Sequence, residues 1–550
     1  MNKWMRASER WRWLTGGAVA FSLLAFLLLL MLLGWQGLRG FWPQPVTLFT
    51  LNQAGAGKMQ VLAEVVSSST VSRQQLAASG ATLPADLPDS VTRYLLKTGN
   101  RDVAGFDFRT LLSSDIRQRQ QPKEIIVLQR RSGGNAYGWF EGLLDGSQPL
   151  IARDLNTVLH ARLEQTREQL EQMADIRLRQ MARINTQLEA LEHQAEELRA
   201  EHRFDAQQQS IHQADRAELQ RQFVRAAARL ALLSNEVDRG ALLLRDSSGK
   251  VQRIPLAQVV AAWYPNAMTS SEKWRHFASQ LWHFVHDSPA ENQSEGGVFP
   301  AIFGTVLMVV LMSLVVMPLG VVAAVWLHEY ARRNALTRLV RIAVVNLAGV
   351  PSIVYGVFGL GFFVWLIGGT IDQLLFPSTL PNPTFGTPGL LWASLTLALL
   401  TLPVVIVATE EGLTRIPASL RQGSLALGAT QAETLWHITL PLALPAMITG
   451  LILAVARAAG ETAPLMLVGV VKMAPELPVD AIFPYLHLDR KFMHLGFQIY
   501  DLAFQSPNTE ADRPLVYATA LLLVCIVLGL NLAAMGLRHR LRERYRTLVQ

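Results

Sequence analysis

Three stretches decide the fold class of this chain: PASLRQGSLALGAT at residues 417–430, ITLP at 438–441 and ARAAGETAP at 456–464. The last lies within an apolar block, yet it carries Arg457 and Glu461. A charge at the centre of a membrane helix costs about 3 kcal/mol on insertion scales, so such residues normally face a polar pathway rather than lipid. The combination of a polar pathway and a loop shaped to bind another protein is typical of one subunit of an energy-driven transporter.

Length and composition favour a membrane protein with more than one domain. The chain has 550 residues, 50% of them hydrophobic, and a mean hydropathy of +0.22. Single domains seldom reach this length, so we expect at least two units. The apolar residues gather in blocks of about 20, the length of a helix that spans a bilayer.

Charge and cysteine content exclude other classes. The net charge of +7 is modest, and the arginines flank the apolar blocks instead of forming the basic face of a nucleic-acid-binding domain, so no nucleic-acid partner is expected. Cys525 is the only cysteine, which excludes an internal disulfide and a cysteine-based metal site. We interpret its thiol as a small packing residue.

Six apolar blocks predict six transmembrane helices. The first block follows four basic residues, but it is longer than the apolar core of a cleaved signal peptide and lacks a clear cleavage site. We therefore expect an uncleaved anchor that holds the chain in membrane lipid. The blocks are 16–35, 301–327, 342–368, 388–409, 442–466 and 515–537.

The short loops set the direction of these spans, because loops rich in Lys and Arg stay in the cytosol. Loop 370–387 has Asp372 and no basic residue, whereas arginines follow the second, fourth and sixth blocks. Both termini are thus expected in the cytosol. The expected domains are 1–39 (cytosolic start and anchor), 40–298 (extracytoplasmic insert), 299–540 (membrane core) and 541–550 (cytosolic tail). The marker arginines are Arg332, Arg333, Arg338, Arg341, Arg415, Arg421, Arg538, Arg540, Arg542, Arg544 and Arg546.

The insert has a mixed α/β pattern. Between about 154 and 239, two runs of apolar residues at heptad spacing predict an antiparallel, coiled-coil-like helical hairpin. The hairpin is either a structural stalk or a docking surface for a partner, and the sequence leaves both open. Strands are expected at Val46–Leu51, Glu124–Arg130, Leu242–Arg245 and Lys250–Ile254, the last two as a hairpin.

The segment 417–441 predicts two short helices joined by a tight turn. Pro417 suits a helix start, and the helix is expected to reach Leu427. Gly428 can adopt the left-handed conformation that ends it. Thr430 and Glu433 have the spacing of a capping box for the second helix.

Arg457 and Glu461 are four residues apart, so we expect both to project from one face of the fifth span. They form either a self-neutralising structural pair or a guanidinium that binds a tetrahedral oxyanion through its fork of donors. Small residues around them permit close helix approach or local unwinding, and Pro464 removes a helical hydrogen bond.

The chain has no recognisable ATP site of its own. A phosphate-binding loop needs Gly-x4-Gly-Lys followed by Ser or Thr, and the segment 55–58 (GAGK) lacks the first glycine and the hydroxyl residue. We therefore expect no enzymatic activity and no cofactor on this chain.

The order Gly428, nine intervening residues, then Ile438-x-Leu440-Pro441 resembles the EAA loop of ABC-importer permeases. In that family this loop docks on a separate ATPase subunit. The family's glutamate and two alanines fall on Gln422, Gly423 and Ser424 here, so the charged contact is absent. With Gly428 and Ala429, these are the residues that the resemblance assigns to ATPase coupling.

The stretch RAAGETAP at 457–464 resembles the signature of phosphate ABC-transporter permeases of the PstA and PstC kind. Segments 303–330, 347–360 and 497–507 agree with the same family. The resemblance covers about 295–540 and favours the PstA type, in a long form with an amino-terminal extracytoplasmic insert. It implies a six-helix, MetI-like permease fold, with Arg457, Glu461, Thr462 and Ser352 along the substrate pathway.

The resemblance also implies a role and partners. The chain would move inorganic phosphate from the periplasm across the inner membrane of a bacterium. Its partners would be a PstC-like permease, a PstB-like ATPase dimer that binds the ATP, and a periplasmic phosphate-binding protein. Segment 347–360 either lines the gate or packs between helices.

Three alternatives stay open on the sequence alone. The cargo could be another oxyanion or a phosphonate. A membrane-anchored sensor would explain the helical insert, but the cytosolic pieces are short for an output domain. An intramembrane metalloenzyme would need His-Glu-x-x-His, and the pair His328–Glu329 lacks the second histidine; Glu329 is better read as a residue at the cytosolic mouth of the second span.

Overall fold

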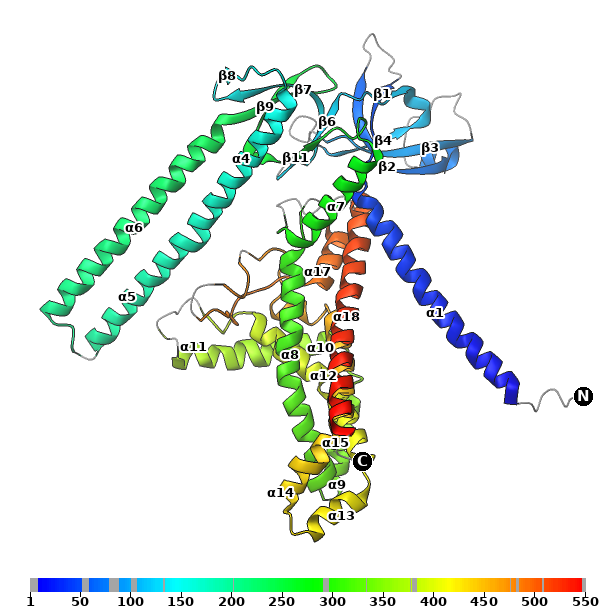
Figure 1. Ribbon diagram of the computed structural model, residues 1–550, viewed down its shortest axis with the longest axis vertical. Coiled ribbons are helices and arrows are strands. Elements are labelled where there is room, and N and C mark those ends of the chain that lie inside the picture. The colour runs from blue at the N-terminus through cyan, green and yellow to red at the C-terminus, as the bar shows by residue number, and fades with distance from the viewer. Residues whose placement is uncertain are drawn as a thin grey trace, which may run out of the picture.

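The computed structural model contains a bundle of long helices, two β-sheets at one end of it, and a long helical hairpin that extends from the sheets (Figure 1). The residues that it describes are 8–51, 59–78, 89–99, 106–131, 134–200, 202–289, 296–332, 334–375, 377, 383–474, 476–480, 484–506 and 509–546.

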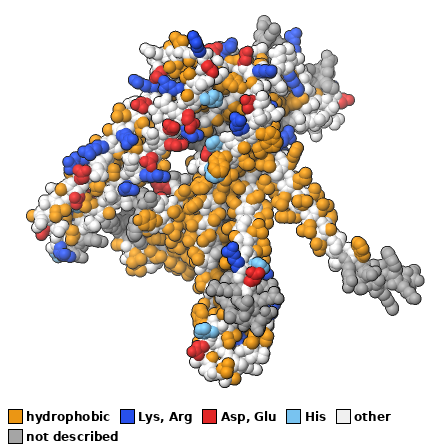
Figure 2. All heavy atoms as spheres, viewed as in Figure 1, with side chains coloured by type: hydrophobic (Ala, Val, Ile, Leu, Met, Phe, Trp, Pro, Cys, Tyr) orange, Lys and Arg blue, Asp and Glu red, His pale blue; other side chains and the backbone are white. Residues whose placement is uncertain are grey.

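Six helices are long and apolar enough to span a membrane, which confirms the predicted number: Trp13–Phe41, Phe299–Tyr330, Ser352–Leu375, Leu390–Thr414, Gln431–Gly460 and Asp512–Arg540. Figure 2 shows hydrophobic side chains over these helices, with charges gathered on the sheets and the hairpin. The elements involved are α1 (Ser8–Leu38), α8 (Phe299–Val325), η6 (Trp326–Tyr330), α10 (Ser352–Phe358), η7 (Gly359–Gly368), α11 (Gly369–Leu375), α12 (Leu390–Thr414), α15 (Leu440–Gly460) and α18 (Thr509–Arg546).

The expected bounds of the third span are wrong. Residues 335–347 form a separate helix, α9 (Ala335–Leu347), and the span begins only at Ser352. Pro351 explains the break, because proline disfavours helical geometry in the residue before it. Gly349-Val350 cannot therefore continue α9 into α10.

The fifth span also ends earlier than expected. Its helix ends at Gly460 rather than near residue 466, and the chain then forms two short helices, α16 (Leu465–Val468) and α17 (Leu495–Tyr500). η10 (Asp501–Gln505) continues α17. The helix end thus falls within the predicted span. Cys525, expected to be a packing residue, is exposed on α18.

Two antiparallel sheets form the β part. One has the strand order β4-β3-β2-β1-β5 and the other β10-β9-β7-β6-β11, with β8 beside β7. Val46, Leu48 and Leu62 of the first sheet pack on Ile125, Val127 and Tyr137 of the second in one buried cluster. The strands are β1 (Val46–Leu51), β2 (Gln60–Ser72), β3 (Ser90–Lys97), β4 (Phe108–Leu112), β5 (Ile116–Gln120), β6 (Ile125–Arg130), β7 (Ala136–Asp145), β8 (Gln148–Pro149), β9 (Gly240–Arg245), β10 (Val251–Pro255) and β11 (Val259–Trp263).

The helical hairpin consists of α4 (Leu155–Asp175), η4 (Ile176–Met181) and α5 (Ala182–Ala200) on one leg and α6 (Ala206–Arg239) on the other. Asp154 caps α4 by accepting hydrogen bonds from the backbone N–H groups of Asn156 and Thr157. The legs run side by side (Figure 1) and are linked by polar pairs such as Arg216–Glu192 at 3.2 Å. The seam between them buries Ile176, Ile184, Ala195, Ala226 and Val237.

A short helix, α7 (Ser270–His286), leads from the sheets into α8. Phe284 near its end packs on Phe41, with ring centroids 5.0 Å apart. Both belong to a cluster that includes Met493, Leu495 and Ala518 of the membrane part. The end of α7 is therefore attached to the bundle through apolar contacts as well as through the chain. The remaining helix in this part is α2 (Arg73–Ala78).

Candidate substrate pathway and coupling segment

The coupling segment, residues 417–439, forms a compact knob at the end of the bundle opposite the sheets (Figure 1). It contains α13 (Ala418–Ala426), α14 (Gln431–Thr434) and η9 (Leu435–Thr439). Gly428 has φ +88°, as the predicted left-handed turn requires. The capping box is also confirmed, because Glu433 N–H donates to Thr430 Oγ1 and Thr430 N–H donates to Glu433 Oε2 at 2.7 Å.

The five predicted coupling residues do not all face outward. Gln422, Gly423 and Gly428 are exposed. Ser424 instead holds α13 against α14, since its Oγ lies 2.9 Å from Thr434 Oγ1 and its carbonyl accepts a hydrogen bond from Ala429 N–H. The knob also exposes large apolar side chains that a soluble surface seldom shows, with Leu427 90% and Trp436 69% exposed.

Arg457 lies in the last turn of α15, and Glu461 is the residue that caps this helix in extended geometry, with φ −81° and ψ 123°. The expectation that both project from one continuous helical face is therefore wrong, because the helix ends between them. They still pair, with Arg457 Nε 3.6 Å from Glu461 Oε1 and 34% and 23% of the two side chains exposed. A cation at this place also interacts favourably with the C-terminal end of the helix dipole.

The distance of 3.6 Å makes this an ion pair without a hydrogen bond. Arg457 Nε is buried and has no hydrogen-bond partner among the described residues. A guanidinium has five N–H donors, and burying them unused is costly. The side chain is thus 34% exposed and paired by charge, with one buried donor unused among the described residues.

The structure brings α10 against the segment that follows Glu461. A side chain added at Gly356 would meet Pro464 Cα at 2.8 Å. Tyr355 on α10 donates a 2.6 Å hydrogen bond to the carbonyl of Leu347. Ser352 begins α10 one turn earlier.

Among the described residues, no hydrogen bond or ion pair joins Arg457 to Ser352 or to Thr462. Thr462 Oγ1 is instead 2.3 Å from where a Cβ on Gly496 would lie, at the start of α17. The structure therefore pairs Arg457 with Glu461, packs α10 on Pro464, and places Thr462 beside Gly496 at the start of α17.

Residues 316–547 match the family described as "Binding-protein-dependent transport system inner membrane component". The phosphate transport system permease protein PstA 1 of Mycobacterium tuberculosis is 31% identical over 293 residues, which are 52% of this chain and 81% of the relative. PstA of Mycobacterium leprae is 34% identical over 291 residues, 52% of this chain and 83% of the relative. PstA of Yersinia pestis is 32% identical over 252 residues, 46% and 75% of the two chains.

The chain belongs to the PstA-type permease family. As a member it is a multi-pass permease subunit of the inner membrane and not itself an enzyme, and such permeases work with ATPase and binding-protein partners. The family match starts at residue 316, so the sheets and the hairpin lie outside it. Among solved structures, a chain of the MetNI methionine ABC transporter in inward-facing conformations matches with 19% identity and a TM-score of 0.33, over 50% of this chain and 99% of that chain.

His494 is a buried residue of this PstA-type permease that the sequence reading missed. It is 1% exposed and caps α17 by accepting the Gly496 N–H on Nδ1 at 3.1 Å. Nε2 therefore carries the proton of the neutral ring, and it has no hydrogen-bond partner among the described residues. Burial lowers the pKa of His494 to about 4, so the ring is neutral at physiological pH. A lone histidine in a loop gives no signal of such burial.

A charged network outside the spans was also not anticipated. Arg490 pairs with Glu476 at 2.9 Å and Asp480 at 2.6 Å, and Lys472 lies 3.2 Å from the buried Asp501. These cations have carboxylate partners, so they hold the loop before α17 in place. Within the described ranges, no group of His, Cys, Asp and Glu side chains could bind a metal ion.

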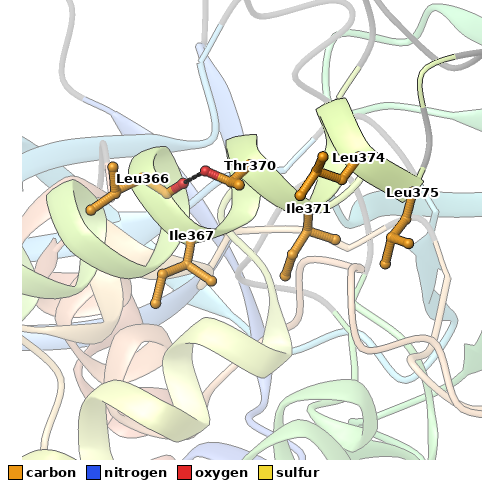
Figure 3. Close-up of a pocket in the computed structure, with 6 residues that line it drawn as sticks. All are labelled: Leu366, Ile367, Thr370, Ile371, Leu374 and Leu375. Carbon is orange, nitrogen blue, oxygen red and sulfur yellow. Dashed lines mark hydrogen bonds between the residues drawn. The ribbon is translucent and has the colours of Figure 1, made fainter.

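A groove of about 340 Å³ lies along η7 and α11 (Figure 3). Thr370 is its one polar residue, and its hydroxyl donates to the carbonyl of Leu366 at 2.6 Å. Among the six residues that line it, the groove therefore offers no free side-chain donor to an anion. Its lining is Leu366, Ile367, Thr370, Ile371, Leu374 and Leu375.

Proposed function

We propose that this chain is the permease subunit through which inorganic phosphate enters the cytoplasm of a bacterium, driven by ATP hydrolysis on a partner. The observation that carries the proposal is Arg457, a partly exposed guanidinium at a helix end, ion-paired but with an unused donor. The relatives named as phosphate transport permeases support the choice of cargo.

The proposed pathway contains Arg457, Glu461, Thr462 and Ser352. A guanidinium matches a tetrahedral oxyanion because two of its N–H groups can donate to two oxygens at once. Glu461 keeps Arg457 in place while the site is empty, and an arriving phosphate competes with this carboxylate for the guanidinium. Such competition holds the anion weakly enough to be released on the other side.

The proposed orientation places the sheets and the hairpin in the periplasm and both termini in the cytosol. The support is that the coupling segment, α9 and the end of α18 lie together at one end of the bundle (Figure 1). These parts carry Arg338, Arg341, Arg421 and Arg538, and basic residues favour the cytosolic side.

The coupling segment is proposed to dock on a PstB-like ATPase dimer, which binds the ATP. Gln422, Gly423 and the exposed Leu427 and Trp436 supply the contact surface, whereas Ser424, Gly428 and Ala429 shape the turn behind it. A PstC-like permease completes the pathway, and a periplasmic phosphate-binding protein delivers the cargo. The apolar faces of the spans contact membrane lipid.

Reconstitution of the complete complex in vesicles tests the proposal. ATP inside and the binding protein with radiolabelled phosphate outside should give accumulation that excess unlabelled phosphate abolishes. Sulfate and methylphosphonate at the same excess should leave uptake unchanged. No ATP-dependent accumulation of the label, or accumulation that methylphosphonate or sulfate abolishes as fully as phosphate does, would contradict a phosphate-specific permease.

A further inference from the structure

Arg421 on α13 contacts the ends of two other helices. Its Nη1 lies 2.9 Å from Glu329 Oε1, in the η6 turn that continues α8, and its Nη2 donates a 2.7 Å hydrogen bond to the carbonyl of Leu413 near the end of α12. Both charged side chains are mostly buried, with 22% of Arg421 and 24% of Glu329 exposed. One planar guanidinium thus joins three helices, as its fixed fork of donors allows.

Other polar contacts hold the same helix ends in place. His328 Nδ1 lies 3.0 Å from Glu329 Oε1. Arg341 on α9 pairs with Glu410 on α12 at 2.6 Å and donates to the carbonyl of Leu327 at 3.4 Å. Glu329 is therefore a fixed partner for Arg421 rather than a freely moving surface carboxylate.

Elsewhere along the helices, α8 and α15 each pack closely on α12 through a glycine. A Cβ on Gly320 of α8 would lie 2.6 Å from Val405 Cγ1 of α12, and a Cβ on Gly450 of α15 would lie 2.8 Å from Ala408 Cβ of α12. Such close packing transmits displacement because it leaves no free volume to absorb it.

The coupling segment is connected to these three helices in different ways. The chain itself joins α13 to α12 and η9 to α15. The chain after α8 leads instead to α9, so α8 has no covalent neighbour in the coupling segment. The Arg421–Glu329 pair supplies the missing attachment.

We propose that Arg421 is a positioning residue that fastens the coupling segment to α8, so that a push on α13 moves α8, α12 and α15 as one body. Gln422, the next residue, is exposed and belongs to the surface proposed for the ATPase. Removing either member of the ion pair leaves the other charge partly buried without its partner, which weakens the attachment. The inference depends on the proposed function for the motor that pushes.

The test is the amount of phosphate transported per ATP hydrolysed by the reconstituted complex. R421Q and E329Q should each lower this ratio about tenfold, which is in the usual range of coupling between sites, while ATP hydrolysis continues. The double variant should be no worse than either single one, because both remove the same contact. R415Q is the matched control, because 82% of the Arg415 side chain is exposed and it lies 3.8 Å from Glu411. The amount of phosphate transported per ATP hydrolysed should not change in R415Q.

An unchanged ratio in R421Q would overturn the proposal. So would a parallel fall of uptake and ATP hydrolysis at equal amounts of assembled complex, since that indicates a merely structural role. If R421Q does not assemble, R421K decides: one ammonium cannot reach both partners as a guanidinium does, so its ratio should fall below that of the wild type. A wild-type ratio in R421K would then contradict the proposal.

A second readout does not depend on the cargo. Val322 on α8 and Leu532 on α18 are 67% and 63% exposed, and both can carry spin labels once Cys525 is replaced by serine. ATP should change the distance between the labels in the wild-type background and leave it unchanged with R421Q. An equal change in the label distance in the wild-type and R421Q complexes refutes the role of Arg421. A wild-type complex in which ATP changes the label distance but no phosphate is transported refutes only the proposed function.

Discussion

Arg457 Nε lies 3.6 Å from Glu461 Oε1 across the point where α15 ends, so the guanidinium is paired by charge but not by a hydrogen bond. A pair of this kind neutralises the cation and leaves Arg457 Nε without a hydrogen-bond partner among the described residues. Residues four apart are neighbours on a helix, and the two side chains stay paired although the helix ends between them.

Glu461→Gln should lower phosphate uptake about tenfold, the factor that about 1.4 kcal/mol of lost positioning represents, because Arg457 loses the carboxylate that orients it. The amount of protein in the membrane should not change. The control is Glu476→Gln, whose carboxylate pairs with Arg490 outside the spans at 2.9 Å and should be near-neutral for uptake. Equal uptake by Glu461→Gln and wild type would remove Glu461 from the pathway.

Gly428→Ala and Gly423→Ala should have effects of opposite sign on thermal stability. Gly428 has φ +88°, and a left-handed alanine costs about 1 kcal/mol. Gly423 lies within α13, where alanine is favoured over glycine by about 0.5–1 kcal/mol. An added Cβ meets nothing within 4 Å at either position, so the backbone alone decides. Thermal unfolding of the purified protein measures both, and a shift of the same sign would contradict the turn geometry.

His494 should make the protein less stable as the pH falls. Its pKa is about 4 in the folded protein against an ordinary value of 6.5, so the unfolded chain binds the proton first. Above pH 6.5 both states are neutral and the residue adds no pH dependence. Between pH 6.5 and 4 about 3 kcal/mol should be lost. His494→Asn should flatten the curve of melting temperature against pH. The control His539→Asn, at an exposed position, should leave the curve as it is in the wild type. Equal slopes in both variants would disprove the role of His494 in the pH dependence.

Asp372→Asn should loosen the turn before α12. The buried carboxylate accepts the N–H groups of Phe385 and Gly386 at 2.8 and 2.6 Å, and an amide offers only one oxygen. The lost hydrogen bond should cost about 1–3 kcal/mol. Hydrogen exchange at the amides of Phe385 and Gly386 should become faster while exchange in α15 does not. Unchanged exchange at both amides would show that these bonds carry no stability.

Local features could be predicted from the sequence, and tertiary ones could not. Gly428 and the Thr430–Glu433 capping box depend on residues within one turn of each other, so their spacing was sufficient. The pair Arg421–Glu329 joins positions 92 apart along the chain, 421 minus 329, and no periodicity marks it.

The same distinction explains the misplaced bounds. Hydropathy merged α9 with the third span because both are apolar, although Pro351 separates them. Hydropathy also placed the end of the fifth span after Gly460, although the helix ends at that residue. Strands such as β2, with a run of serines at Ser67–Ser69, lack the alternation that would have revealed them.

The most direct test of the central claim compares Arg457→Gln with wild type in the reconstituted complex, under identical ATP and phosphate. The account predicts that the variant assembles, retains ATP hydrolysis and loses phosphate uptake by about tenfold or more, with Arg457→Lys between the two because a single ammonium cannot donate bidentately. Wild-type uptake by Arg457→Gln would contradict it.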